Sequence, residues 1–228
     1  MFLQQNRGFM RKYIEILKKS ELFTGVEETD IEAMLSCLGA TLRKYKKGEY
    51  VFREGERVDH ITVLVEGCLH IQKDDYWGNC SIINRIEEGK MFGEAYVSSK
   101  GLPLLNDVVA VKDSAVIFFD VNRILSTCSS ACRFHALTVK NLFYAISEKN
   151  RNLVSKLGYM SSRTTKEKLL AYFSDQAKKH SSATFEIPFN RQQLADFLSV
   201  DRSAMSNELC KMRDSGILEF KKNRFTLK

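Results

Sequence analysis

The 228-residue sequence lacks several features that assign a protein to a specialised class. No apolar run approaches the roughly 18–20 residues of a membrane-spanning helix. One of the longest apolar runs in the chain covers only residues 115–119. The first residues show no basic segment followed by an apolar core, so we expect no secretory signal. The six cysteines are scattered, whereas small secreted domains hold theirs in closely spaced frameworks. These absences predict a cytoplasmic protein with reduced thiols and no membrane association.

Histidine is also scarce, with four residues, and they fall into no Ser/His/Asp, Cys/His or metal-protease spacing. We therefore expect no enzyme. Hydrophobic residues make up 44% of the chain and charged residues 28%, which excludes a disordered chain, a collagen-like repeat and a coiled-coil rod. The length suits two unequal domains or one large one.

Short β-type runs separated by glycine occupy residues 41–120. The clearest runs are residues 61–65, 68–71, 81–83 and 115–119. Regularly spaced short strands with turn signals predict a compact antiparallel roll, preceded by helices over residues 9–19 and 29–38. Such a module commonly holds a small molecule. With the helices that follow, the fold class is predicted as α+β.

After the roll, the hydrophobic period changes to that of a helix. Residues 131–158 contain no proline, and apolar residues recur at a 3/4 spacing at Val139, Leu142, Ile146, Leu153, Leu157 and Met160. A single stripe at near-heptad spacing favours a helix that pairs with its own copy. The alternative is a helix that packs only on its own domain. We predict a sensing domain over residues 1–130, a dimerisation helix over 131–158 and a third domain over 159–228.

The third domain carries most of the positive charge. Residues 159–228 contain 13 Lys and Arg against 8 Asp and Glu, whereas the preceding 158 residues contain 22 and 20. A regional surplus of this kind is typical of a domain that meets a polyanion such as double-stranded DNA.

Residues 190–209 have the pattern of two short helices joined by a tight turn. Asp201 would cap the second helix, whose buried stripe would be Met205, Leu209 and Met212. Arg, Asn and Ser side chains can read base edges or hold phosphates. The predicted outer face comprises Arg202, Ser203, Ser206, Asn207 and Lys211. Beyond it, residues 217–220 and 224–227 predict a hairpin whose tip places Lys222 on a backbone phosphate.

Taken together, these segments resemble the Crp/Fnr superfamily of bacterial transcription regulators over nearly the whole chain. The residues that carry the resemblance are 47–56, 65–67 and 92–94 in the roll and, most specifically, 189–206. The resemblance implies a cyclic nucleotide-binding-like β-roll, a dimerisation helix and a winged helix-turn-helix. It also implies a homodimer on a pseudo-palindromic operator, and contact with RNA polymerase if the protein is an activator. Arg202, Ser203 and Asn207 would lie nearest the bases, with Arg191 and Gln192 near phosphates.

The same resemblance places an effector pocket in the roll. Phe92, Gly93 and Glu94 match the start of the family's phosphate-binding cassette, while Leu104 and Leu105 fall where cyclic-nucleotide-binding members carry Arg followed by Ser or Thr. Leucine cannot hold an anion, and burying a phosphate without a cation is costly. We therefore predict an unidentified effector other than a cyclic nucleotide, unless a shifted loop supplies Lys100 as the cation.

Cysteine spacing supports neither an iron–sulfur cluster nor haem, because no cysteine precedes Cys37 and no Cys-x-x-Cys-His occurs. Cys128, Cys132 and His135 would share one face of a helix and form a thiol or metal sensor. The alternative is structural packing, and the sequence leaves both open. An alternative function is likewise open, namely a small-molecule-binding or redox-sensing module that acts on a protein partner.

Overall fold

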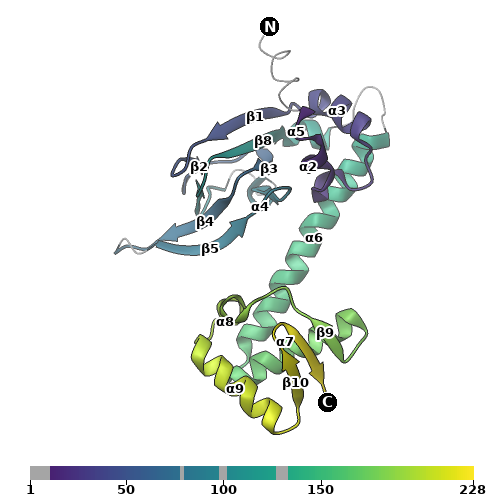
Figure 1. Cartoon of the computed structure of the whole chain (residues 1–228). Coiled ribbons are helices and arrows are strands. Elements are labelled where there is room, and N and C mark those ends of the chain that lie inside the picture. The colour runs from purple at the N-terminus through teal and green to yellow at the C-terminus, as the bar shows by residue number, and fades with distance from the viewer. Residues whose placement is uncertain (1–10, 78–79, 98–101, 127–132) are drawn as a thin grey trace. The chain divides into compact units, whose positions relative to one another are not determined.

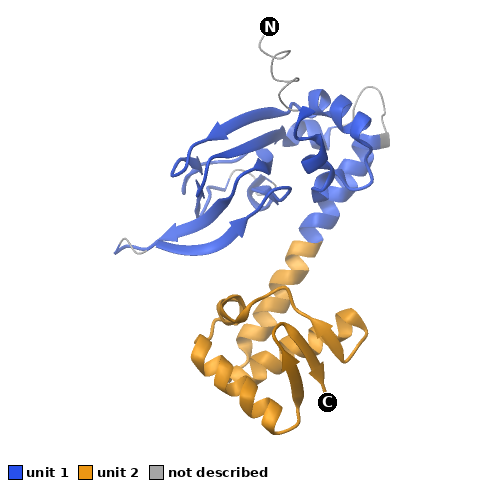
Figure 2. Ribbon diagram, viewed as in Figure 1, with its two compact units in different colours: residues 1–147 blue, residues 148–228 orange. Residues whose placement is uncertain are grey.

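The computed structural model describes residues 11–77, 80–97, 102–126 and 133–228 (Figure 1). The chain forms two compact units, residues 1–147 and residues 148–228 (Figure 2). Their boundary lies within the long helix α6 (Arg133–Ser161), whereas the sequence analysis placed domain boundaries near the two ends of this helix. An antiparallel β domain, a long helix and a helix-turn-helix follow one another, so the α+β prediction is confirmed.

Two four-stranded antiparallel sheets form the roll of the first unit. One sheet has the order β1 (Thr41–Tyr45), β8 (Ser114–Asp120), β3 (His60–Glu66) and β6 (Met91–Phe92). The other has the order β2 (Tyr50–Phe52), β7 (Asp107–Ala110), β4 (Leu69–Asp74) and β5 (Cys80–Ile86). The four predicted β runs fall on β3, β4, β5 and β8.

Strands β3 and β8 are buried on both faces, which explains why they read as continuous apolar runs. Side chains alternate along a strand, so Ile117 and Phe119 point to one face of β8 while Val116 and Phe118 point to the other. The first face packs on the helices α2 (Ile14–Lys18), η1 (Glu21–Phe23) and α3 (Glu28–Cys37). The second face packs with apolar residues of both sheets.

Part of α6 belongs to the core of the first unit. His135, Thr138 and Ala145 are buried there, and the Asn141 Nδ2 atom donates hydrogen bonds to the carbonyls of Leu22 (3.2 Å) and Thr24 (2.8 Å). Two short helices complete this unit, α4 (Glu94–Val97) and α5 (Val121–Leu125).

The predicted stripe on α6 needs a correction at two positions, because Val139 and Leu142 both pack in the core of the first unit. Leu142 is only 6% exposed and packs in the core of the first unit, whereas its neighbour Phe143 is 68% exposed. The sequence pattern does not distinguish the two residues, because both lie close to the apolar face. Leu142 is covered because it joins the core cluster to which α2, η1 and α3 contribute.

The second unit combines the end of α6, three further helices and a small sheet of order β10-β11-β9 around a separate core. Its elements are α7 (Thr165–His180), β9 (Thr184–Glu186), α8 (Arg191–Leu198), α9 (Arg202–Asp214), β10 (Leu218–Lys221) and β11 (Arg224–Leu227). The predicted hairpin is confirmed as β10 and β11, and β9 adds a third strand to it. Aromatic rings fill the core, with the Phe173 and Phe225 centroids 4.4 Å apart.

Candidate nucleic-acid interface

Helix α8 is fixed at both ends. Asn190 and Gln193 form a reciprocal capping box at its start, because each side chain accepts a hydrogen bond from the other residue's backbone N–H. At its end, Ser199 adopts a left-handed conformation (φ 51°) that reverses the chain, and the Lys168 ammonium donates to the Leu198 carbonyl at 3.2 Å. Three side chains of α8 are buried, as the sequence predicted: Leu194, Ala195 and Leu198.

Helix α9 follows after a three-residue connection, and its orientation about its own axis is set by burial. The Asp201 carboxylate accepts a 2.7 Å hydrogen bond from the Ala204 N–H and so caps the helix. The predicted buried stripe is confirmed, since Met205, Leu209 and Met212 are all in the core. Because these residues anchor one face, the opposite face of α9 points outward.

Ser203 and Asn207 are exposed on this outer face, and Arg202 is exposed at the first position of the helix; the described residues offer these three side chains no hydrogen-bond partner. Ser206 is engaged, since its hydroxyl donates to the Arg202 carbonyl at 2.8 Å. Lys211 lies 4.0 Å from Glu208, and an exposed pair of this kind is weak and exchangeable. Helix α9 therefore presents a guanidinium, an amide and a hydroxyl in the arrangement that suits base edges and phosphates.

Arg191 and Gln192 lie at the start of α8 in different surroundings from those that the resemblance implied. The Arg191 guanidinium stacks over Phe220 at 4.8 Å and Phe225 at 5.0 Å, and burial lowers the pKa of this side chain. Gln192 donates to the Asp196 carboxylate at 2.8 Å. Arg191 therefore ties α8 to the hairpin, and a phosphate contact from either residue stays a prediction.

The hairpin tip is basic, as the run Lys221-Lys222-Asn223 predicts, and the structure adds Arg224 to it. Lys222 is exposed with φ 54°, in the two-residue turn between β10 and β11. Lys221 and Arg224 are directly opposite each other across the hairpin, and both are exposed. The register would have revealed the pair, because a two-residue turn brings its flanking residues onto one face of the hairpin.

The residues predicted to form an effector pocket separate into two groups. Phe92 and Leu104 are buried in the roll core, where Phe92 stacks edge-on against Phe52 at 6.0 Å. Leu105, by contrast, is 58% exposed. Gly93 adopts φ +85° immediately before Glu94, the first residue of α4. The structure thus brings Phe92 and Leu104 together through packing and leaves Leu105 outside.

The predicted thiol or metal sensor is described only in part. His135 is buried, and its Nε2 atom donates to the Ile124 carbonyl at 2.7 Å. Cys128, Cys132 and Lys100 lie outside the described residues. Within residues 11–77, 80–97, 102–126 and 133–228, no group of three His, Cys, Asp or Glu side chains is positioned to hold a metal ion. None of the helices over the same residues is long and apolar enough to span a bilayer.

Two family models match the chain, one in each unit. Residues 42–131 match the model of the cyclic nucleotide-binding domain, and residues 167–228 match the model of the Crp-like helix-turn-helix domain. Among curated proteins, cGMP-dependent protein kinase 2 of Homo sapiens is 24% identical over 110 residues, or 48% of this chain. The aligned segment is only 14% of that kinase, so the likeness concerns a single domain.

Solved structures resemble the chain over most of its length. Catabolite Activator Protein of Thermus thermophilus is 19% identical with a TM-score of 0.52, covering 92% of this chain and 94% of that one. CprK complexed with OCPA is 15% identical with a TM-score of 0.55, covering 86% and 88%. At these identities the likeness establishes the fold. The chain thus joins a cyclic nucleotide-binding domain to a Crp-like helix-turn-helix domain, the two domains of Crp/Fnr-like DNA-binding transcription regulators.

Proposed function

We propose that the protein is a homodimeric, non-catalytic transcription regulator in the cytoplasm that reads a pseudo-palindromic operator with one α9 helix per half-site. The exposed residues of α9 carry this proposal, because Ser203 and Asn207 lie opposite the buried Met205 and Leu209, and Arg202 is exposed at the start of the helix. Arg pairs with guanine and Asn with adenine in the major groove. The cations Lys211 and Lys222 supply phosphate contacts that hold the register.

Exposed apolar residues on α6 support the dimer. Leu153 is 62% exposed and Leu157 is 67% exposed. Together with the exposed Phe143 they continue a 4/3 spacing, completed by Ile146, Asn150 and Met160. This spacing is that of a helix that pairs with a second copy through positions a and d of a heptad. A polar residue such as Asn150 at one of these positions specifies register in paired helices.

An effector that binds the roll would regulate DNA binding by favouring one arrangement of the dimer. It can shift the equilibrium only by its difference in affinity for the two arrangements. Leu104 lies in an apolar core, so a buried phosphate beside it would have no cation from this residue. A cyclic nucleotide is therefore not the proposed effector. If the protein activates transcription, RNA polymerase is a further partner.

A selection from random-sequence DNA duplexes tests the proposal. The full-length protein is incubated with the pool, retained duplexes are sequenced, and affinity for the selected site is measured by fluorescence anisotropy at two salt concentrations. We expect an inverted repeat with half-sites about 34–36 Å apart. The logarithm of the affinity should fall with the logarithm of salt concentration by about 0.9 for each neutralised phosphate. No retention at low salt would overturn DNA binding, and an enriched site without symmetry would overturn the dimer.

A further inference from the structure

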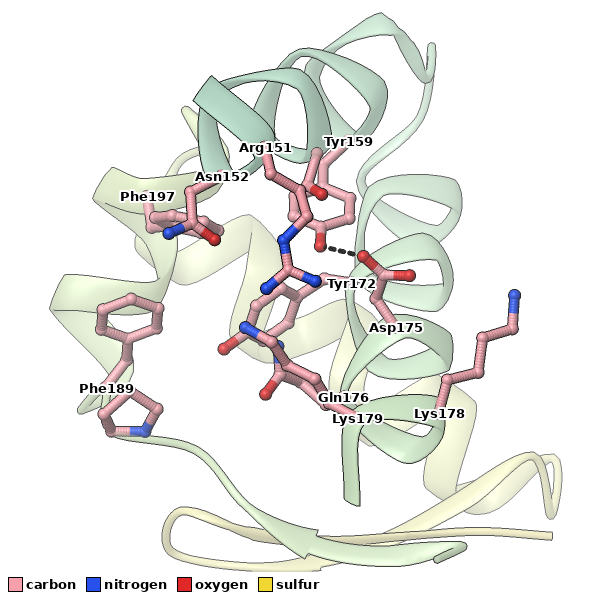
Figure 3. A pocket seen from close by; sticks show the side chains of 12 residues that line it. Arg151, Asn152, Tyr159, Tyr172, Asp175, Gln176, Lys178, Lys179, Phe189 and Phe197 are labelled. Atoms are coloured by element: carbon pink, nitrogen blue, oxygen red, sulfur yellow. Dashed lines mark hydrogen bonds between the residues drawn. The ribbon is translucent and has the colours of Figure 1, made fainter. Parts of the chain in front are cut away.

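A cavity of about 660 Å³ lies in the second unit, and none of its lining residues belongs to α9 (Figure 3). Its walls come from residues 151–159 of α6, residues 172–179 of α7, the segment before α8, and Phe197 of α8. This volume falls in the usual range of about 300–1,000 Å³ for small-molecule sites.

Aromatic rings form a large part of the wall. The ring centroids of Phe189 and Phe197 are 4.9 Å apart, those of Tyr172 and Phe197 are 5.5 Å apart, and those of Tyr159 and Tyr172 are 5.6 Å apart. These rings belong to three helices and to the segment before α8, and they meet around one space (Figure 3). Flat surfaces of this kind favour a flat aromatic guest, because ring pairs gain energy beyond the area they bury.

Positive charge predominates among the other lining residues. The lining contains Arg151, Lys178 and Lys179 but a single acid, Asp175. The Tyr159 hydroxyl donates a 2.5 Å hydrogen bond to the Asp175 carboxylate. Burial and this bond raise the pKa of Tyr159 to about 12, so the phenol keeps its proton and continues to satisfy the carboxylate at neutral pH.

The side chains of Lys178 and Lys179 point in different directions. Lys179 follows Tyr172 by seven residues, Asp175 by four and Gln176 by three, so it shares their face of α7. Lys178 points away from the other labelled side chains in Figure 3. Arg151 is held by Glu148 at 2.6 Å, an exposed pair that a competing anion can exchange at small cost. Lys179 is therefore the principal cation available to a guest.

The cavity also lies on the side of α6 that a dimer leaves open. Arg151, Ser155 and Tyr159 recur every four residues on one face of the helix. At 3.6 residues per turn, this face is turned away from Leu153 and Leu157, which we assign to the pairing surface. A second copy seated on the pairing surface would not cover the cavity.

We propose that this cavity binds a small aromatic carboxylate. The ring packs against the half-buried Phe189 and Phe197, and the carboxylate accepts charge-assisted hydrogen bonds from Lys179 and, by exchange with Glu148, from Arg151. The site is separate from the roll and its cognate effector. Because the guest contacts α6 and α8 together, it links the pairing helix to the DNA-reading helices. This regulatory consequence rests on the proposed function, whereas binding itself does not.

The test is isothermal titration calorimetry of the full-length dimer with 2-naphthoate as the probe. The neutral analogue 2-naphthylmethanol and the non-aromatic cyclohexanecarboxylate serve as comparison ligands. We expect saturable binding of 2-naphthoate and at least tenfold weaker binding of each comparison ligand. Lys179→Ala should weaken 2-naphthoate binding about tenfold, since it removes one charge-assisted hydrogen bond. Lys166→Ala, which removes an exposed cation of the same helix outside the cavity, should change it less than twofold.

A second variant tests the aromatic wall. Phe197→Leu keeps apolar volume at this position but removes the ring, and we expect it to weaken 2-naphthoate by several-fold while far-ultraviolet circular dichroism stays unchanged. Equal losses from Lys179→Ala and Lys166→Ala, or no binding of 2-naphthoate to a protein that still binds its selected operator, would overturn the proposal. The latter result would leave the proposed DNA binding intact, because the operator measurement is made without the probe.

Discussion

The two units of the chain differ in where their charge and their apolar surface lie. Residues 1–147 contain 19 basic and 19 acidic residues, whereas residues 148–228 contain 16 and 9. The whole surplus of +7 therefore belongs to the second unit, which also holds the exposed α9 face and the basic hairpin tip. The net positive charge of the second unit favours contact with a polyanion, whereas the neutral first unit fits the role of an effector-sensing domain.

The two parts of helix α6 also differ in how much of their apolar surface is buried. Within the first unit it buries His135, Thr138, Leu142 and Ala145, and within the second it buries Tyr159 while much of its apolar stripe stays exposed. A long helix with unburied leucines is under-packed in one chain, and a second copy supplies the missing surface. The apolar side chains in the first part of α6 are thus covered by their own unit. We propose that a second copy of the chain covers those in the second part.

The largest expected effect is the loss of dimerisation when the proposed pairing surface of α6 is changed. Leu153→Asp should convert the dimer to a monomer, because a charge would enter the centre of the paired stripe in both protomers. Central apolar contacts of this type are worth about 2 kcal/mol or more each. Sedimentation velocity measures the outcome. Asn152→Asp adds the same charge at an exposed position about 100° round α6 from Leu153, outside the proposed stripe, and should leave the dimer intact. A dimeric Leu153→Asp variant would show that the stripe has another role.

A second expected effect lies in the roll, where two adjacent leucines differ in burial. Leu104 is 4% exposed and packs in the core, so Leu104→Ala should lower the free energy of unfolding by about 2–5 kcal/mol. Leu105→Ala alters a mostly exposed side chain and should change it by less than about 0.5 kcal/mol. Urea unfolding of both variants measures the difference. Equal and small effects would show that Leu104 does not fill the core.

A third pair of variants distinguishes residues of the second unit that contact base edges from residues that contact phosphates. Arg202→Ala should weaken binding to the selected operator by about 1–3 kcal/mol and relax base preference at one position. Lys222→Ala should weaken binding to all duplexes alike and reduce the salt slope by about one. Anisotropy titrations against the operator and single-base variants measure both. If Arg202→Ala bound the operator as tightly as the unchanged protein, α9 would not be the reading helix.

The smallest effect concerns pH. Burial and the hydrogen bond to Asp175 raise the pKa of Tyr159 from 10.0 to about 12. The folded protein therefore keeps this proton where the unfolded chain has lost it, so this contribution to stability is present below pH 10 and disappears as pH rises through 12. Tyr159→Phe should make the loss of stability over this range shallower, as measured by urea unfolding at several pH values. Tyr144→Phe, at an exposed position, is the control, and identical slopes for both variants would contradict the assignment.

Some features were predictable because they depend on residues close in sequence. The Asp201 cap, the buried faces of α8 and α9, and the strands β3 and β8 follow from spacing and short-range hydrogen bonds. Arg191 was not predictable in the same way. Its guanidinium stacks on Phe220 and Phe225, about thirty residues further along the chain, and local pattern carries no signal of that contact. The third strand β9 and the cavity beside Tyr159 are long-range features of the same kind.

The sequence by itself determined the order of roll, pairing helix and DNA-reading domain, the regional charge, and which residues of α9 are buried. Periodicity and composition record these directly, because they arise from one element or from a simple count. Only the tertiary structure decided that Leu142 is covered while Phe143 is exposed, that Leu104 and Leu105 separate, and that residues of α6, α7 and α8 enclose a cavity. These outcomes depend on which distant surface packs against each side chain, and that choice belongs to the folded chain as a whole.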